Sequence, residues 1–344
     1  MYGHAKRYGY ESKGMTTWVG SSVPTSLTDA QIKQMRNDKS VKQISEDEAV
    51  LFSSNPPWSD TAFVNGSGEW WSWGRNAING KTYSGSINTA SNRRVYIIDS
   101  GVANHWDLPS VTSRINVGCG TGNCDSAQWP VVGCYAHATH VAGIIGATAN
   151  ANWGVAGVYA GVEMRSVAYI AARSETWGIC SDFQGLTSAI SNFGYALDHV
   201  FWEIFTSGSL VVPIVNISQN SMGIGFDQNG QPGPNYGKLQ TLLQPNYFVW
   251  QYWPYTGPYP GAFIVQSAGN SGSSVCTLPS PAYRPWANFD GTAVDGIMVV
   301  GSLSSSGAPT SSFSPPNPAS ASGTALASNH GDCVDVWAPG DDIV

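Results

Sequence analysis

The sequence has no long apolar run. None of its 344 residues lies in a stretch that approaches the roughly 20 apolar residues of a membrane-spanning helix. The opening, MYGHAKRYGYESKGM, also lacks the apolar core of a secretory signal peptide. The sequence therefore shows no targeting signal of its own.

Charged residues are scarce. They make up 11% of the chain, and the net charge of -7 at pH 7 gives no basic surface for nucleic acid. Gly (39), Trp (14) and Tyr (15) are plentiful instead, which is typical of a compact, loop-rich globular protein. Because 344 residues exceed a typical single domain, we expect one large α/β domain together with a smaller one.

The chain has no CxxC motif, so a zinc ribbon or a thioredoxin-like site is not favoured. Its six cysteines are an even number, which permits three disulfides in an oxidising compartment. Cys119 and Cys124 enclose GTGN, a turn-rich segment suited to a small closed loop. The other four cysteines are widely spread, at Cys134, Cys180, Cys276 and Cys333.

Charge is unevenly distributed along the chain. Residues 1–50 hold 13 of the 39 charged residues, which is about three times the charge density of the remainder. Within this part, TDAQ (28–31) is a capping-box pattern ahead of a short helix, and SVKQISEDEAV (40–50) alternates like a strand. NPPWSD and VNGSGE then read as linker. We therefore predict a small α+β module over residues 1–55 and a larger domain over 56–344.

The larger part has apolar strands separated by helical segments. Five β-branched runs are bounded by Gly, Asp or Ser: 94–99, 164–172, 210–218, 261–270 and 295–302. The segments 137–149 and 186–201 have helical periodicity. Right-handed crossovers would place these helices on the faces of one sheet. The sequence thus predicts a three-layer α/β domain with a parallel sheet.

Polar side chains follow two of these strands. Asp99 closes RVYIID, Asn270 closes IVQSAGN, and His137 opens a helix at AHATHVAG. Because chemistry in such folds gathers at the carboxyl ends of strands, these three groups are expected to converge. A carboxylate, an imidazole and an amide are three of the four parts needed for acyl transfer by a serine nucleophile.

Five motifs, in order and spacing, make the pattern specific. VYIIDSGV, HATHVAGIIGA, VNIS, SAGN and CVDVWAPG together resemble the subtilisin-like serine proteases, most of all their proteinase K-type branch, from about Trp71 to the end of the chain. Upstream, LTDAQIKQMRNDKSVKQISEDEAV (27–50) resembles the last half of the family's inhibitory propeptide. The resemblance implies a subtilisin-like fold and hydrolysis of peptide bonds.

The resemblance also implies roles for particular residues. Asp99 matches the carboxylate that orients the catalytic imidazole, and His137 matches the general base. His140 corresponds to a structural second histidine, and Asn270 matches the side-chain donor of the oxyanion hole. The substrate-binding backbone is expected at two places: Ser218, Gln219 and Asn220, then Ala268 and Gly269.

Three departures from the family stand out. Ala138 replaces a usual Gly beside the base, and SQNS (218–221) replaces SLGG, which would narrow the specificity pocket. The nucleophile motif that should follow APG (338–340) is missing, because only DDIV remains. SGTALAS (322–328) resembles that motif by chance, with Ala325 at the nucleophile position and Ser328 a poor candidate. We expect the catalytic Ser beyond residue 344, so that the sequence as given is inactive.

The resemblance further implies disulfides that join Cys134 to Cys180 and Cys276 to Cys333, with Cys119 to Cys124 as the third, in a secreted protein. No cofactor is required. Calcium is common in the family as a structural ion, but the loop 149–157 offers only Asn150 and Asn152 as side-chain ligands. We expect a monomer whose N-terminal module is an intramolecular inhibitor, cut between Leu51 and Glu69, and whose substrates are proteins or peptides.

Two other functions are compatible with parts of the pattern. A noncatalytic, peptide-binding relative would also lack the nucleophile. A metal-dependent hydrolase would use Cys134, His137 and His140 as zinc ligands, but zinc-protease helices place histidines four apart with a glutamate between them. The retained Asp99, His137 and Asn270 favour the protease.

Overall fold

The structure is a computed structural model. It describes residues 27–39, 41, 49–51, 63–64, 70–78, 94–117, 124–125, 136–149, 154–169, 187–218, 235–249, 256–275, 297–311, 327–341 and 343. The structural statements below concern these residues.

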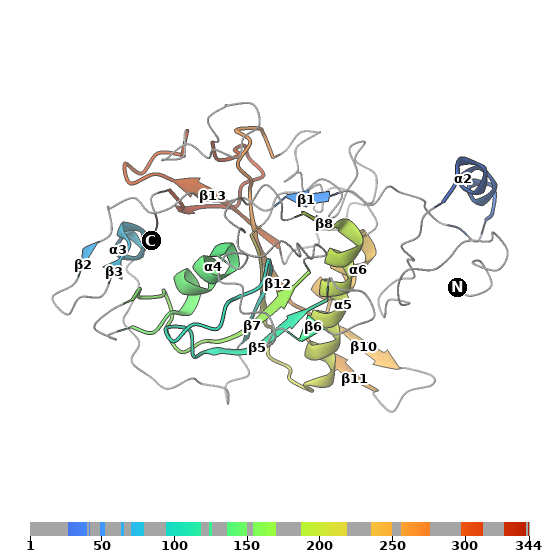
Figure 1. The fold of residues 1–344 in the computed structure, drawn as a ribbon, viewed down its shortest axis with the longest axis horizontal. Coiled ribbons are helices and arrows are strands. Elements are labelled where there is room, and N and C mark those ends of the chain that lie inside the picture. The colour runs from blue at the N-terminus through green and yellow to red at the C-terminus, as the bar shows by residue number, and fades with distance from the viewer. Residues whose placement is uncertain are drawn as a thin grey trace.

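An eight-stranded sheet forms the centre of the molecule (Figure 1). Its first seven strands in spatial order are parallel, and the last pairs antiparallel at one edge. In that order the strands are β14 (Val336–Pro339), β13 (Ile297–Leu303), β12 (Phe263–Ser267), β9 (Ile214–Ile217), β4 (Arg94–Asp99), β7 (Glu163–Ala168), β5 (Val111–Asn116) and β6 (Cys124–Asp125). The predicted α/β fold with a parallel sheet is confirmed.

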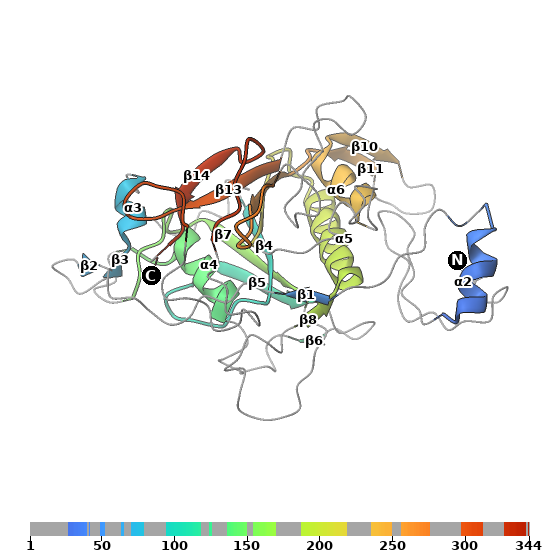
Figure 2. The same ribbon diagram turned by 90° about the horizontal axis from the view of Figure 1, so that it is seen from above.

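Strand β4 shows how the sheet acquires two covered faces. Tyr96 and Ile98 point into a cluster with helices α5 (Ile190–Thr206) and α6 (Tyr236–Leu243). Val95 and Ile97 point the other way, into a second cluster with helix α4 (Ala136–Gly146). This alternation is the period-two geometry of a strand that is buried on both sides. Helices therefore cover both faces, as the sequence predicts (Figures 1 and 2).

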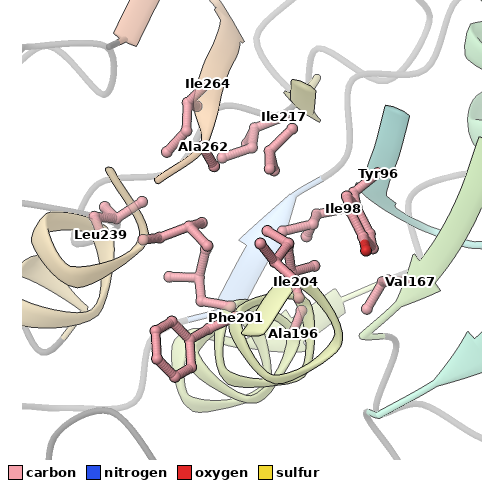
Figure 3. Close-up of a cluster of buried hydrophobic side chains, with 14 of the residues drawn as sticks. Tyr96, Ile98, Val167, Ala196, Phe201, Ile204, Ile217, Leu239, Ala262 and Ile264 are labelled. Atoms are coloured by element: carbon pink, nitrogen blue, oxygen red, sulfur yellow. The ribbon is translucent and has the colours of Figure 1, made fainter. Parts of the chain in front are cut away.

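The larger cluster lies between the sheet and α5. Figure 3 shows Ala196 and Ile204 of α5 facing Ile98 of the sheet, with Phe201 at the side of α5 and Leu239 of α6 nearby. A buried ion pair joins the two helices, with Lys238 Nζ 2.7 Å from Asp198 Oδ2. Burial of these aliphatic and aromatic side chains, each contributing about 1.5–3 kcal/mol, stabilises this face of the sheet.

Two small hairpins lie outside the sheet. Strands β10 (Asn246–Val249) and β11 (Thr256–Tyr259) pair beside α6, and β2 (Phe63–Val64) pairs with β3 (Trp70–Trp71). Helix α3 (Trp73–Ala77) follows β3 and contacts the segment after β14.

The N-terminal elements match part of the prediction. Helix α2 (Asp29–Arg36) has the predicted capping box, since Thr28 Oγ1 accepts from Gln31 N (3.3 Å) and Thr28 N donates to Gln31 Oε1 (2.7 Å). Strand β1 (Ala49–Leu51) pairs antiparallel with β8 (Thr187–Ala189). Residues 42–48 of the predicted strand lie outside the described residues.

Two predicted elements differ in the structure. Residues 187–189 were expected to begin a helix but form β8, because they pair with β1. The run 210–218 was expected to be a buried strand, but β9 begins only at Ile214, and Leu210 and Val212 are 68% and 51% exposed. Pro213 explains this late start, since proline has no N–H to donate to a central ladder. No helix in the described part of the chain is long and apolar enough to cross a membrane.

Candidate active site

The carboxyl end of β4 carries a buried carboxylate. Asp99 is the last residue of the strand and is fully buried, with Oδ1 accepting a hydrogen bond of 2.6 Å from the backbone N–H of Ser100. Gly101 follows with φ of 105°, a conformation that side chains other than glycine rarely adopt. The chain therefore turns sharply away after Asp99 and leaves the strand end open to α4.

Helix α4 supplies the partner of this carboxylate. His137 is the second residue of the helix, and its Nδ1 lies 2.8 Å from Asp99 Oδ1. A carboxylate next to Nδ1 favours the tautomer that carries its proton there, which leaves Nε2 as an acceptor. The side chain of His137 is still 12% exposed. The pairing therefore makes Nε2 the basic nitrogen of the ring.

Hydrogen bonds hold the loop after β4 against α4 and β7. Thr139 Oγ1 accepts from Ala103 N at 2.9 Å, and Ser166 Oγ accepts from Val102 N at 3.0 Å. Ala138 is fully buried in the cluster on the α4 face of the sheet. The Asp99–His137 pair is thus fixed by packing on one side and by hydrogen bonds to the backbone on the other.

The two histidines of α4 have different proton affinities. Burial opposes a charge on His137, but the charge of Asp99 and its hydrogen bond outweigh burial and raise the pKa of His137. His140 is partly buried, and this burial followed by the charge of His137 lowers the pKa of His140, although a hydrogen bond with the backbone of Ile343 opposes this. His137 is therefore the histidine able to take up a proton.

Asn270 lies at the same edge of the sheet. It follows β12 by three residues, and β9 alone separates β12 from β4 in the sheet order. Since these strands are parallel, their carboxyl ends bring Asn270 to the edge where Asp99 and His137 meet. Gly269, just before it, has φ of 108° and turns the chain at this point.

The expected substrate-binding residues are described only in part. Ser218 follows β9, and its Oγ accepts from Asn216 Nδ2 at 2.9 Å, whereas Gln219 and Asn220 lie outside the described residues. The N–H of Ala268 donates to Val300 O, and the carbonyl of Gly269 accepts from Asn329 N. The backbone at 268–269 is therefore largely engaged within the fold, and its role toward substrate stays a prediction.

Ser328 has the environment of a structural residue. Its side chain is buried, and Oγ accepts from Ser302 N (2.9 Å) while it donates to Asn329 O (3.0 Å). A hydroxyl engaged in this way, with no imidazole among its hydrogen-bond partners, is not activated for attack. Asn329, which the sequence reasoning missed, is fully buried next to it and hydrogen-bonds the loop that carries Asn270. Its importance is visible only in these tertiary contacts.

The cysteines and the calcium loop are mostly outside the described residues. Cys333 is not a free thiol, and it packs against the buried cluster of Ala268, Val275 and Val299, whereas its predicted partner Cys276 is not described. Of the remaining four, only the backbone of Cys124 is described, in β6. Likewise Asn150 and Asn152 are not described.

A further carboxylate lies at the end of the predicted calcium loop. Buried Asp107 accepts from Val155 N at 3.0 Å through Oδ2, and its backbone carbonyl accepts from Thr148 N. The sequence analysis did not single it out, because it lies more than 40 residues before the loop. No group of three metal-ligating side chains is present within the described ranges.

Three comparisons with known proteins were made. No curated protein matches the sequence. Among solved structures, an epidermin leader peptide processing serine protease from Staphylococcus aureus is 17% identical with a TM-score of 0.54, over 98% of this chain and 72% of that one. A psychrophilic subtilisin-like protease, Apa1, from the Antarctic psychrotroph Pseudoalteromonas sp. AS-11 is 24% identical with a TM-score of 0.45, over 78% of this chain. The match spans only 46% of the length of Apa1.

The family comparison is the more specific one. A family model described as the subtilase family, peptidase S8, matches residues 90–343, well over half of the chain. The matched range begins just before β4 and includes Asp99, His137 and Asn270. The chain therefore belongs to the subtilase family, whose fold its parallel sheet and flanking helices display.

Proposed function

We propose that this chain is the larger part of a secreted serine endopeptidase, in which Asp99, His137 and a serine form the catalytic triad and Asn270 contributes to the oxyanion hole. The observation that carries the proposal is the hydrogen bond between Asp99 and His137 at the carboxyl edge of the central strand. Membership of the subtilase family supports peptide-bond hydrolysis as the reaction.

The proposed mechanism has two halves. As the serine Oγ attacks the carbonyl carbon of the substrate, His137 Nε2 takes the hydroxyl proton and Asp99 stabilises the imidazolium. The Asn270 side chain donates to the developing oxyanion, and His137 then passes its proton to the leaving amine as the acyl-enzyme forms. In the second half, water loses a proton to His137 and attacks the acyl-enzyme carbonyl. His137 then returns this proton to the serine Oγ as the acyl–oxygen bond breaks, which releases the new carboxyl terminus and regenerates the serine.

The nucleophile is proposed to come from a segment that follows Val344 in the natural protein. The support is the position of Ile343, whose backbone hydrogen-bonds His140 one turn from His137 along α4. A chain continuing from this point enters the site beside the general base. The alternative role, a noncatalytic peptide-binding module, would need no such segment.

The N-terminal segment is proposed to be the remnant of an inhibitory propeptide. Strand β1 pairs antiparallel with β8, which leads directly into α5 of the peptidase domain. Strand addition of this kind is a common way for a peptide to occupy an edge of a fold. The proposed cleavage between Leu51 and Glu69 would release this segment after folding.

Several further features complete the proposal. They are a proteinase K-type disulfide pattern, secretion, a monomeric state and a structural calcium ion. Asp107, close to Val155 at the end of the loop 149–157, would add a carboxylate to the two asparagines as calcium ligands. These side-chain oxygens are hard donors of the type that calcium prefers, and the proposed mechanism routes no step through the ion.

Fluorophosphonate labelling of the natural protein, followed by peptide mapping and an intact mass, tests the proposed function. We expect an adduct on a serine in a peptide beyond Val344. The matched His137→Ala variant should not label, because its serine lacks the general base. A mass that ends at Val344 with no adduct would overturn the endopeptidase and leave the peptide-binding role.

A further inference from the structure

We propose that Asn329 is the positioning residue of the oxyanion donor: it fixes the backbone on both sides of Asn270. This inference rests on the proposed role of Asn270. Asn329 is fully buried in the segment between residues 327 and 330, which runs beside the loop after β12 through two isolated bridges, Ser271 with Ala327 and Ser274 with His330.

The side-chain amide and the backbone N–H of Asn329 both form hydrogen bonds with this loop. Its side-chain Oδ1 accepts from Ser271 N (3.0 Å), Ser271 Oγ (2.8 Å) and Ser273 N (2.9 Å). Its Nδ2 donates to Ala268 O at 2.9 Å, and its backbone N–H donates to Gly269 O at 2.7 Å. One residue therefore contacts the loop both before and after Asn270.

The two bonds that flank Asn270 matter most. The carbonyl of Gly269 and the N–H of Asn270 belong to the same planar peptide group, and the carbonyl of Asn270 shares a group with the N–H of Ser271. Asn329 holds the first group through the Gly269 carbonyl and the second through the Ser271 N–H. Both peptide planes that set the direction of the Asn270 side chain are thereby fixed.

This anchoring is needed because the loop itself is permissive. Gly269 and Gly272, on either side of Asn270, adopt positive φ values of 108° and 62°. Glycine alternates readily between such conformations and ordinary ones, so the loop would otherwise sample several orientations. An oxyanion donor acts only when it is preorganised at about 2.7–3.1 Å from the developing charge.

The size of the effect follows from known precedents. Loss of the oxyanion donor costs about 10²- to 10³-fold in turnover, a value established on subtilisin itself. A displacement of about 1 Å in a catalytic group costs on the order of 10²-fold. We therefore expect Asn329→Ala to lower kcat of the natural, full-length protein by about 10- to 100-fold while KM changes by less than about twofold.

A double-mutant cycle separates positioning from general weakening of the fold. In the full-length protein, Asn329→Ala should have no further effect on kcat when Asn270 is already alanine, because the group it positions is gone. Equal losses of kcat in both backgrounds would overturn the inference. Thr310→Val is the matched control, since it removes a buried hydroxyl that bonds Ser302 Oγ (2.9 Å) without touching the loop. The control should keep kcat unchanged.

Asn329→Asp provides a conservative comparison. It keeps the oxygen that accepts from Ser271 and Ser273, and it loses the bond to Ala268. It should therefore retain more kcat than Asn329→Ala, even if burial of the carboxylate lowers its stability. A loss of kcat as large as that of the alanine variant would contradict positioning through the oxygen.

A second measurement does not depend on peptidase activity. Hydrogen exchange at the amides of Ser271 and Ser273, read by NMR in the chain described here, should become at least about 10-fold faster in Asn329→Ala and stay unchanged in Thr310→Val. Unchanged protection of these amides would overturn the inference. If the natural protein proves to have no peptidase activity but the amides do lose protection, the proposed function fails while the loop anchor stands.

Discussion

At the scale of single residues, the site depends on one carboxylate oxygen. Asp99 Oδ1 accepts both from Ser100 N and from His137 Nδ1, so the strand end and the helix start are tied to the same atom. Because Asp99 is fully buried, its charge acts on the imidazole with little screening from water. The raised pKa of His137 is the direct result.

The first prediction concerns this charge. Asp99→Asn removes the group that raises the pKa of His137 but leaves burial, so the pKa of His137 should fall below that of the wild-type protein. An NMR titration of the imidazole resonances measures it. A His137 titration that is identical in both proteins would contradict the proposed pairing.

The second prediction uses the opposite shift of His140. Its folded-state pKa is lowered, so the unfolded chain binds more protons, and the stability that the neutral ring contributes is lost as pH falls from about 6.5 through the folded pKa. The pH dependence for His137 is the opposite. The charged His137 ring contributes its full stability to the fold below about pH 6.5, and this stability is lost as pH rises through the raised folded-state pKa.

Urea unfolding at several pH values tests the His140 prediction. The advantage of the wild-type protein over His140→Gln should be largest above pH 7 and should shrink toward pH 5, because glutamine cannot be protonated. A constant difference across this pH range would exclude His140 as the source.

Some of the residues in and around the site could be predicted from the sequence, and others could not. Asp99, His137 and Asn270 stand at strand ends or a helix start inside recognisable motifs, so their positions at one edge were predictable. Asn329 and Asp107 have no such signal, because each acts through contacts with a segment more than 40 residues away. A fully buried asparagine and an exposed one look the same in a sequence.

At the scale of elements, α5 and α6 are joined by a buried charge pair. Lys238→Met should destabilise the protein by about 3–5 kcal/mol, since it leaves the Asp198 carboxylate buried without its cation. The double variant Asp198→Leu with Lys238→Met should recover much of this loss, because no charge then remains. Chemical denaturation of the two single variants, Lys238→Met and Asp198→Leu, and of the double variant measures both effects, and strictly additive losses would contradict the pairing.

A pair of glycines offers a matched test of packing. A Cβ on Gly157 would lie 2.4 Å from the backbone N of Ala147, at the end of α4, so Gly157→Ala must move backbone and should cost several kcal/mol. Gly237 in α6 has open space around its Cβ position, and Gly237→Ala should stabilise by about 0.5–1 kcal/mol through helix propensity. Thermal denaturation compares the two, and equal changes in Tm would show that the loop after α4 is not tightly packed.

The strands of the central sheet were predictable from the sequence where they are apolar. β4, β9 and β12 fall within predicted strands, and β7 and β13 each extend one residue beyond theirs, because central strands buried on both faces are continuous hydrophobic runs. The outer strands β5 and β14 were not predicted. VTSRIN is half polar and partly exposed, and VWAP is only four residues long. Strand identity there comes from a neighbour that the sequence does not reveal.

At the scale of the whole molecule, α3 and the C-terminal residues described here are far apart in the chain but in contact in the fold. Trp73 Nε1 donates to Asp341 O at 2.9 Å, and a Cβ on Gly74 would lie 2.6 Å from Pro339 Cβ. Helix α3 thereby holds the residues after β14, which lead toward His140 (Figure 2).

The last prediction tests this closure. Trp73→Phe keeps an aromatic side chain but replaces the indole with a smaller phenyl ring and loses the hydrogen bond to Asp341, so it should cost at least about 1 kcal/mol of unfolding free energy. Amide exchange in the peptide 337–343 should rise at the same time. Trp106→Phe, at a half-exposed ring, is the control and should leave that exchange unchanged. Unaltered exchange in both variants would mean that α3 does not hold this segment.

The order of the strands also determines how long β4 exists during synthesis before its second neighbour is made. β4 lies between β7 and β9, yet β9 begins more than 100 residues later in the chain. At about 5–20 residues per second, β4 leaves the ribosome roughly 6–23 s before its second neighbour exists. β7 is made before β9, so the edge of β4 that faces β9 is the last to gain its partner. Until then, this edge is open to pairing with other nascent chains, which makes aggregation during synthesis a hazard of this strand order.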